Sequence, residues 1–309
     1  MREAISNVVG NVSLAVQSLT LLFFPSAKAG WLGRTVAEKY SDRPEIDEHR
    51  RQAIAGPGPT QSRLIETYLT PGASVIDIGC AAGRFCFAIH ERGHRVVGVD
   101  LAEPMVREGA ALARERGASI PFCVMDAQAL AVRAASFDAA LLLGSVLSHV
   151  PGRRARLSTL REAHRILTSG GTLLIETQSR ASSLRHRAFF AAMTWVRRAL
   201  LAIGRRPAWE IGDRFGVEVS GAGPGKRVYF HMYAPDELEA DLCEAGFEPR
   251  LVDTGLYLMR FVATKLGGGL RPPISVIEGL GSASGPASPR TAIGRHAPDG
   301  AFLPTSPQD

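Results

Sequence analysis

The residues most suited to chemistry lie in one short segment, Val75-Ile-Asp-Ile-Gly-Cys-Ala-Ala-Gly-Arg84. An apolar run ending in Asp77 predicts a buried strand, and the small residues Gly79, Ala81 and Gly83 predict a tight turn that opens a helix. Small residues let a ligand approach the backbone, and the first N–H groups of a helix are unpaired donors. The segment therefore predicts a nucleotide-binding turn. Nicotinamide sites need a different glycine spacing, which this segment does not match, so that cofactor class is excluded.

Two further acids follow apolar runs in the same way. Asp100 ends the run Val96-Val-Gly-Val and stands seventeen residues after Gly83, which is the length of one helix and a turn. A carboxylate there can accept hydrogen bonds from both hydroxyls of a ribose. Asp126 follows a third run, 119–125. Because the carboxyl ends of parallel strands meet at one edge of a sheet, we expect these acids to lie near Asp77.

In this order, the three segments resemble class I S-adenosylmethionine (SAM)-dependent methyltransferases of the ubiquinone/menaquinone-biosynthesis type. In that family an acid precedes Gly-x-Gly-x-Gly; here Asp77, Gly79 and Gly83 match, and Ala81 replaces the middle glycine. The resemblance covers residues 62–177 closely and 229–264 loosely. It implies SAM as the cofactor and an enzyme that methylates an acceptor by in-line displacement.

The resemblance also implies roles for individual residues. Asp77 would hold the methionine amino group, and Asp100 would hold the ribose. Asp126 would contact the adenine amino group, and residues 101–105 would border the adenine. The predicted cofactor-binding residues are Asp77, Gly79, Ala81, Gly83, Asp100, Leu101, Asp126, Ala127 and Gly144.

A catalytic base is needed only where the acceptor is a weakly acidic hydroxyl or thiol, because holding the acceptor in line supplies most of the acceleration. His149, which follows the fourth apolar run, is the candidate base; the alternative is a loop histidine that binds backbone. His231 and Tyr233 are expected to reach the pocket from the lid side, and Tyr40 to cover the cofactor.

The elements needed to position these residues alternate between strand and helix. This pattern predicts an α/β, Rossmann-like sheet of seven mostly parallel strands flanked by helices, with a helical insertion after strand five. We divide the chain into an N-terminal helical region (1–58), a SAM-binding core (59–177), a basic insertion or lid (178–230), a C-terminal part of the core (231–265) and a disordered tail (266–309).

The insertion carries most of the net charge. Residues 178–230 contain ten Arg or Lys against three acids, whereas the whole chain has a net charge of +6. The segment 185–206 predicts an amphipathic helix with three possible roles: a lid over a small acceptor, a contact with an anionic membrane that delivers a lipid-like or quinone-precursor acceptor, or a grip on RNA phosphates. We rank them in that order, against an ordinary substrate-domain helix with a solvated arginine face.

The cysteines and the N-terminal segment bear on metal binding and on cellular location. The four cysteines form no CxxC pair, so no metal site is expected, and their usage favours the cytoplasm. Residues 5–24 predict an amphipathic helix that packs on the domain or touches a membrane, in preference to a signal peptide. Two functional alternatives stay open: a tRNA- or RNA-modifying methyltransferase, and a SAM-binding regulatory protein without transferase activity.

Overall fold

The structure is a computed structural model that describes residues 36, 38–181, 184–207, 209–218, 226–255 and 257–266. The helix expected at 5–24 and nearly all of the tail expected at 266–309 lie outside the described residues. Among the described helices, none is both long enough and apolar enough to cross a membrane.

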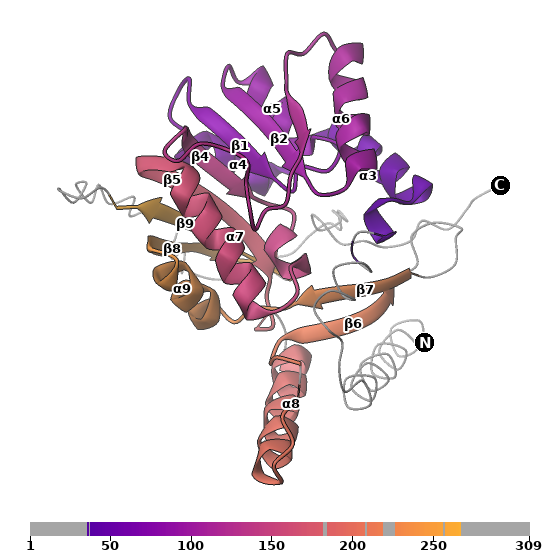
Figure 1. The fold of residues 1–309 in the computed structure, drawn as a ribbon, viewed down its shortest axis with the longest axis vertical. Coiled ribbons are helices and arrows are strands. Elements are labelled where there is room, and N and C mark those ends of the chain that lie inside the picture. The colour runs from indigo at the N-terminus through magenta and orange to yellow at the C-terminus, as the bar shows by residue number, and fades with distance from the viewer. Residues whose placement is uncertain are drawn as a thin grey trace, which may run out of the picture.

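A seven-stranded sheet forms the centre of the fold (Figure 1). Its strand order is β3-β2-β1-β4-β5-β9-β8, and β9 alone runs antiparallel to its neighbours. This confirms the predicted fold class. The strands are β1 (Ser74–Ile78), β2 (Arg95–Asp100), β3 (Phe122–Val124), β4 (Phe137–Leu142), β5 (Leu167–Gln178), β8 (Phe247–Thr254) and β9 (Leu258–Lys265).

The central strands are mostly apolar because helices cover both faces of the sheet. The 3-10 helix η1 (Val146–His149) follows β4. The helices are α3 (Arg43–Ala55), α4 (Pro59–Tyr68), α5 (Arg84–Glu91), α6 (Glu103–Glu115), α7 (Arg153–Ile166) and α9 (Pro235–Glu244).

Two hydrophobic cores result, one on each face of the sheet. On one face, apolar side chains of α4, α5 and α6, such as Ile65, Ile89 and Leu112, pack on the strands. On the other face α7 and α9 supply the cover, with Leu160 and Leu242 fully buried. This arrangement places the carboxyl ends of β1, β2, β3 and β4 along one edge, where the predicted site residues stand.

The insertion after β5 contains the expected helix α8 (Leu184–Ala202) and also a β-hairpin that the sequence analysis did not anticipate. The hairpin strands β6 (Asp213–Glu218) and β7 (Lys226–His231) form a separate antiparallel two-stranded sheet. α8 projects away from the main sheet beyond β6 (Figure 1). The hairpin lies against η1, next to the edge of the sheet that carries the predicted site.

Candidate functional site

The turn between β1 and α5 adopts the backbone shape that its small residues suggest. Gly79 has φ +77° and Gly83 has φ +93°, values that suit glycine. A Cβ on Gly79 would come within 2.5 Å of the Val146 side chain, so η1 closes directly over the turn. Ala81 has φ +46°, so the replacement of the family's middle glycine places an alanine in a left-handed conformation, at a cost of about 1 kcal/mol.

Asp100 links this turn to the end of β2. Its Oδ2 accepts a hydrogen bond from the N–H of Ala81 and its Oδ1 accepts one from the N–H of Ala102, each at 2.8 Å. Burial raises the pKa of Asp100 and outweighs the opposing effect of these backbone donors. The carboxylate is therefore held in a fixed orientation, and each oxygen keeps a lone pair for a further donor such as a ribose hydroxyl.

Asp77 occupies a drier position at the end of β1. It is 1% exposed, and among the described residues its carboxylate accepts one side-chain hydrogen bond, from Cys86 Sγ at 3.3 Å. Burial raises the pKa of Asp77 to about 7. Burial destabilises the ionised form of Asp77, and a cationic group beside it would offset much of this effect. The position therefore fits a ligand that carries an ammonium or a sulfonium.

A cavity lies between the turn, the end of β4 and helix α3. Gly79, Ala81 and Gly144 line it, as predicted for cofactor-binding residues. The other lining residues are His49, Cys80, Ala82, Arg84, Phe85 and Leu143.

The remaining predicted cofactor residues lie near this cavity but do not line it. Gly83 packs against Phe122 and Phe87 and caps α5. Leu101 is 58% exposed after β2. Asp126 is exposed after β3, where its Oδ1 accepts a hydrogen bond from the N–H of Gln128, and Ala127 packs against the core. The three acids Asp77, Asp100 and Asp126 thus follow three adjacent strands, but their roles toward a cofactor stay predictions.

Six of the lining residues were not predicted from the sequence, and two of them, Arg84 and His49, have side chains that can carry charge. Arg84 begins α5; its guanidinium lies over the Phe85 ring at 4.5 Å and makes no ion pair with a described carboxylate. Burial lowers the pKa of Arg84, while the charges of Glu176 and Asp77 oppose that shift. His49 reaches the cavity from α3. Arg84 could have been predicted because it directly follows the glycine turn. His49 could not, because only the fold brings α3 to the cavity.

A buried acid supports the loop after β4. Glu176, at the end of β5, accepts hydrogen bonds from Gln61 Nε2 at 2.9 Å and from the N–H of Gly144 at 3.3 Å. Arg260 Nε neutralises it from β9 at 2.6 Å. Gly144 is thereby held in its φ +69° conformation at the mouth of the cavity. This acid was also missed, since its partners come from distant segments.

His149, the candidate base, ends η1 and is not among the residues that line the cavity. Its Nδ1 lies 3.0 Å from the carbonyl oxygen of Tyr229 in β7. Because a carbonyl oxygen only accepts, Nδ1 carries a proton in this contact, and in the neutral form of the ring Nε2 would be the basic nitrogen. The Tyr40 ring meets both His149, at 5.9 Å, and His49, at 5.6 Å. That Tyr40 covers the cofactor stays a prediction.

His231 and Tyr233 do not reach the cavity, contrary to our expectation. Both are fully buried, and their rings are in contact at 4.7 Å. His231 Nδ1 lies 2.8 Å from Asp213 Oδ1, and Nε2 lies 3.0 Å from Glu237 Oε1. Burial lowers the pKa of His231, but the two carboxylates outweigh it, and the net pKa is raised. Both ring nitrogens thus contact carboxylate oxygens, and the ring connects β6 to α9.

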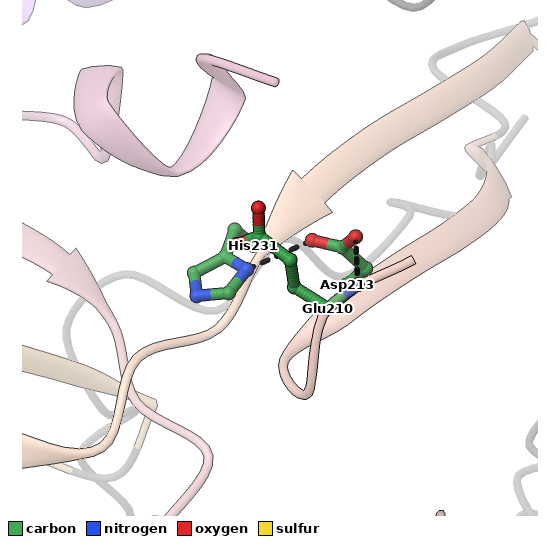
Figure 2. Close-up of side chains that lie close together, drawn as sticks. All are labelled: Glu210, Asp213 and His231. Atoms are coloured by element: carbon green, nitrogen blue, oxygen red, sulfur yellow. Dashed lines mark hydrogen bonds and ion pairs between the residues drawn. The ribbon is translucent and has the colours of Figure 1, made fainter. Parts of the chain in front are cut away.

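Glu210, Asp213 and His231 form a cluster that could in principle hold a metal ion (Figure 2). Their donor atoms lie within 4.8 Å of one another. However, Asp213 Oδ1 already accepts hydrogen bonds from Tyr229 and His231, and the fully buried Arg156 binds Glu210 at 2.5 Å. A guanidinium at this distance opposes a second cation. We therefore interpret the cluster as an ion-pair network that fastens the β6–β7 hairpin to α7 and α9.

Comparison with known proteins agrees with this geometry. Residues 75–171 match the family described as a methyltransferase domain. A ubiquinone biosynthesis O-methyltransferase from Idiomarina loihiensis is 36% identical over 110 residues, which is 35% of this chain and 44% of that protein. A probable tRNA methyltransferase 9B from Bos taurus is 31% identical over 116 residues, which is 38% of this chain and 24% of that protein. The chain thus spans less than half the length of these curated relatives.

Solved structures show the same fold. A SAM-dependent methyltransferase from Methanosarcina mazei aligns with a TM-score of 0.54 at 22% identity, over 68% of this chain and 99% of its own. The 1,6-didemethyltoxoflavin-N1-methyltransferase of Burkholderia thailandensis, solved with S-adenosylhomocysteine, aligns with a TM-score of 0.53 at 21% identity, over 79% and 92% of the two chains. Residues 75–171 thus match a methyltransferase domain, and the chain has the fold of SAM-dependent methyltransferases, for which SAM is the cofactor.

Proposed function

We propose that the chain is an active methyltransferase that transfers the methyl group of SAM to a hydroxyl of a ring-bearing small molecule. The observation that carries the proposal is the hydrogen bond from His149 Nδ1 to the Tyr229 carbonyl oxygen at 3.0 Å, which orients the ring at the end of η1. A neutral imidazole with a basic Nε2 is the form that removes a proton from a hydroxyl.

The shape of the acceptor side favours a small, planar acceptor. α3 brings His49 to the cavity and the Tyr40 ring lies between His49 and His149, while β7 adjoins η1 from the other side. Aromatic rings arranged edge-to-face present flat apolar walls to an incoming ring. One curated relative is named for ubiquinone biosynthesis and another for tRNA, so their names do not decide between acceptors. The proposal of a small acceptor therefore depends on the geometry.

The residues divide the chemistry among them. Asp100 and the backbone of the turn would orient the cofactor, Asp77 would face its cationic portion, and Arg84 would meet its carboxylate. When bound, SAM supplies an electrophilic methyl group on a positively charged sulfur. His149 Nε2 would take the proton of the acceptor hydroxyl as the oxygen becomes methylated, and the Tyr229 carbonyl stabilises the resulting imidazolium through the Nδ1 proton.

The test is incubation of the protein with labelled SAM and fractionated cell extract, separated into small molecules, lipids and RNA. We expect label in the small-molecule or lipid fraction. With the acceptor identified, His149→Ala should lower turnover about 100-fold or more while the affinity for S-adenosylhomocysteine stays unchanged. His90→Ala, on α5, is the matched control.

Other outcomes would replace the proposal. Label in RNA would assign the chain to nucleic-acid modification. Cofactor binding with no labelled product in any fraction would favour a regulatory protein, and unchanged turnover in His149→Ala would remove the base.

A further inference from the structure

Helix α8 and the segment that returns from it form an arm outside the main sheet (Figure 1). The inner face of α8 packs on the returning segment. Met193 contacts Trp209 of that segment, and Phe189, Leu200 and Ile211 pack against them. Arg197 Nη1 donates hydrogen bonds to the carbonyl oxygens of Pro207 and Trp209, and its guanidinium lies over the Trp209 ring. The arm is thus a packed unit with its own small core.

The outer face of α8 is apolar and exposed. Leu184 is 81% exposed, Trp195 is 70% exposed, and Ile203, just past the helix, is 71% exposed. Exposed alanines occupy much of the surface between them, at 188, 191, 192, 199 and 202. These positions recur at helical spacing and form one stripe along a helix of 19 residues. Large apolar side chains gathered on one outward face indicate a binding surface.

Helix α8 and the residues just after it carry positive charge without negative charge. No acidic residue occurs between Ser179 and Trp209. Arg187, Arg198, Arg205 and Arg206 are exposed, and none of them forms an ion pair with a carboxylate of the described residues. The Arg198 guanidinium lies 5.7 Å from the centre of the Trp195 ring, so charge and aromatic surface are joined.

We propose that the outer face of α8 docks on an anionic lipid bilayer. A helix with leucine, isoleucine and tryptophan flanked by arginines lies in the plane of the interface, with its apolar side chains among the acyl chains and its guanidiniums at the head groups. An RNA-binding surface would present the arginines without the exposed leucine and isoleucine between them. The proposal goes beyond the proposed function, because lipid binding does not require methyl transfer.

The test is sedimentation of the full chain with vesicles of phosphatidylcholine alone and of phosphatidylcholine mixed with phosphatidylglycerol. We expect binding to the mixed vesicles, weak binding to the neutral ones, and loss of binding as salt is raised. Arg198→Glu should lower the partition coefficient by at least about fivefold, the value for one basic residue at an anionic surface. Trp195→Ser should lower it further and should remove the blue shift of tryptophan fluorescence on binding.

Two matched controls change the same side-chain types elsewhere. Arg133→Glu alters an exposed arginine before β4, at the opposite end of the sheet, and Leu251→Ser alters an exposed leucine in β8. Both should bind vesicles like the unmodified protein, and all variants should keep their affinity for S-adenosylhomocysteine, which reports an intact core. That affinity measurement also separates failure of this proposal from failure of the proposed function.

Several results would overturn the proposal. One is absence of binding to the anionic vesicles, and another is equal loss in the control variants. Salt-sensitive tRNA binding that Arg198→Glu and Trp195→Ser abolish, without vesicle binding, would assign the surface to nucleic acid. A dimer in light scattering that Trp195→Ser dissociates, again without vesicle binding, would assign it to a second copy of the chain.

Discussion

The two sides of the candidate site are built by different means. On the cofactor side, short-range backbone contacts dominate: a small-residue turn folds beneath η1, and Asp100 accepts hydrogen bonds from the N–H groups of Ala81 and Ala102. On the acceptor side, a β-hairpin is fastened by side-chain ion pairs between residues far apart in sequence. Arg156 binds Glu210, Arg180 binds Glu237, and His231 lies between two carboxylates.

This difference indicates how each side can change. A backbone-built site tolerates few substitutions, because an added Cβ meets a neighbour at once, as it would at Gly79. A hairpin held by side chains can be repositioned by changing a few charges without disturbing the central sheet. The names of the curated relatives, one for tRNA and one for ubiquinone biosynthesis, differ in the acceptor and are consistent with that division.

The largest effect is expected from Arg156, the fully buried cation of the network. Arg156→Met should lower the free energy of unfolding by about 3 kcal/mol, because it leaves the partly buried Glu210 without the guanidinium it binds. Denaturant unfolding measures the loss. The double variant with Glu210→Gln should recover part of it, and a purely additive double variant would contradict the pairing.

The next effect tests the cofactor side. Asp100→Ala should weaken the binding of S-adenosylhomocysteine about 100-fold or more, since hydrogen bonds to a charged group contribute about 1.5 to 3 kcal/mol each. Isothermal titration calorimetry provides the affinity. Asp138→Asn, which alters an exposed acid of β4 at the other end of the sheet, should leave it unchanged. An unaltered affinity in Asp100→Ala would show that the predicted ribose site is wrong.

A smaller effect is expected from Arg84. Arg84→Ala should weaken S-adenosylhomocysteine about tenfold, the loss of one charge-assisted pair, and should not change the affinity for 5′-methylthioadenosine, which lacks the carboxylate. Isothermal titration calorimetry measures both affinities, and a loss for S-adenosylhomocysteine alone would place Arg84 at the ligand carboxylate. Equal weakening of both would assign Arg84 to support of the turn instead.

The smallest effect is a local response of the hairpin to pH. The folded pKa of His231 is raised above its ordinary 6.5, so the imidazolium contributes stability that is fully present below that value and is lost as pH rises through the folded pKa. Asp213, Glu237, Arg156 and the Tyr233 ring face it and set that pKa.

Hydrogen-exchange protection, corrected for intrinsic rates, should therefore fall in the hairpin residues 209–218 and 226–231 above that pH, while β1 and β2 remain protected. His231→Gln should abolish this dependence. A fall that persists in that variant would show that another group is responsible.

Much of the fold and half of the site could be predicted from the sequence. The apolar runs, the glycine turn and the acids Asp77 and Asp100 are neighbours along the chain, and local backbone rules connect them to a shape. The seven-stranded sheet with one antiparallel strand was predicted for the same reason and is confirmed. The burial of Asp77 and the raised pKa that follows were not visible, since they depend on what covers the strand.

Only the tertiary structure decided the acceptor side. His231 and Tyr233 looked like pocket residues because they precede a helix near the expected lid, but the fold buries them against Arg156 and Glu237. The β6–β7 hairpin carries no turn signal strong enough to predict it, and two of the ion pairs around it join residues more than fifty positions apart. Charged side chains find such partners through the packing of distant elements, and no local pattern encodes that choice.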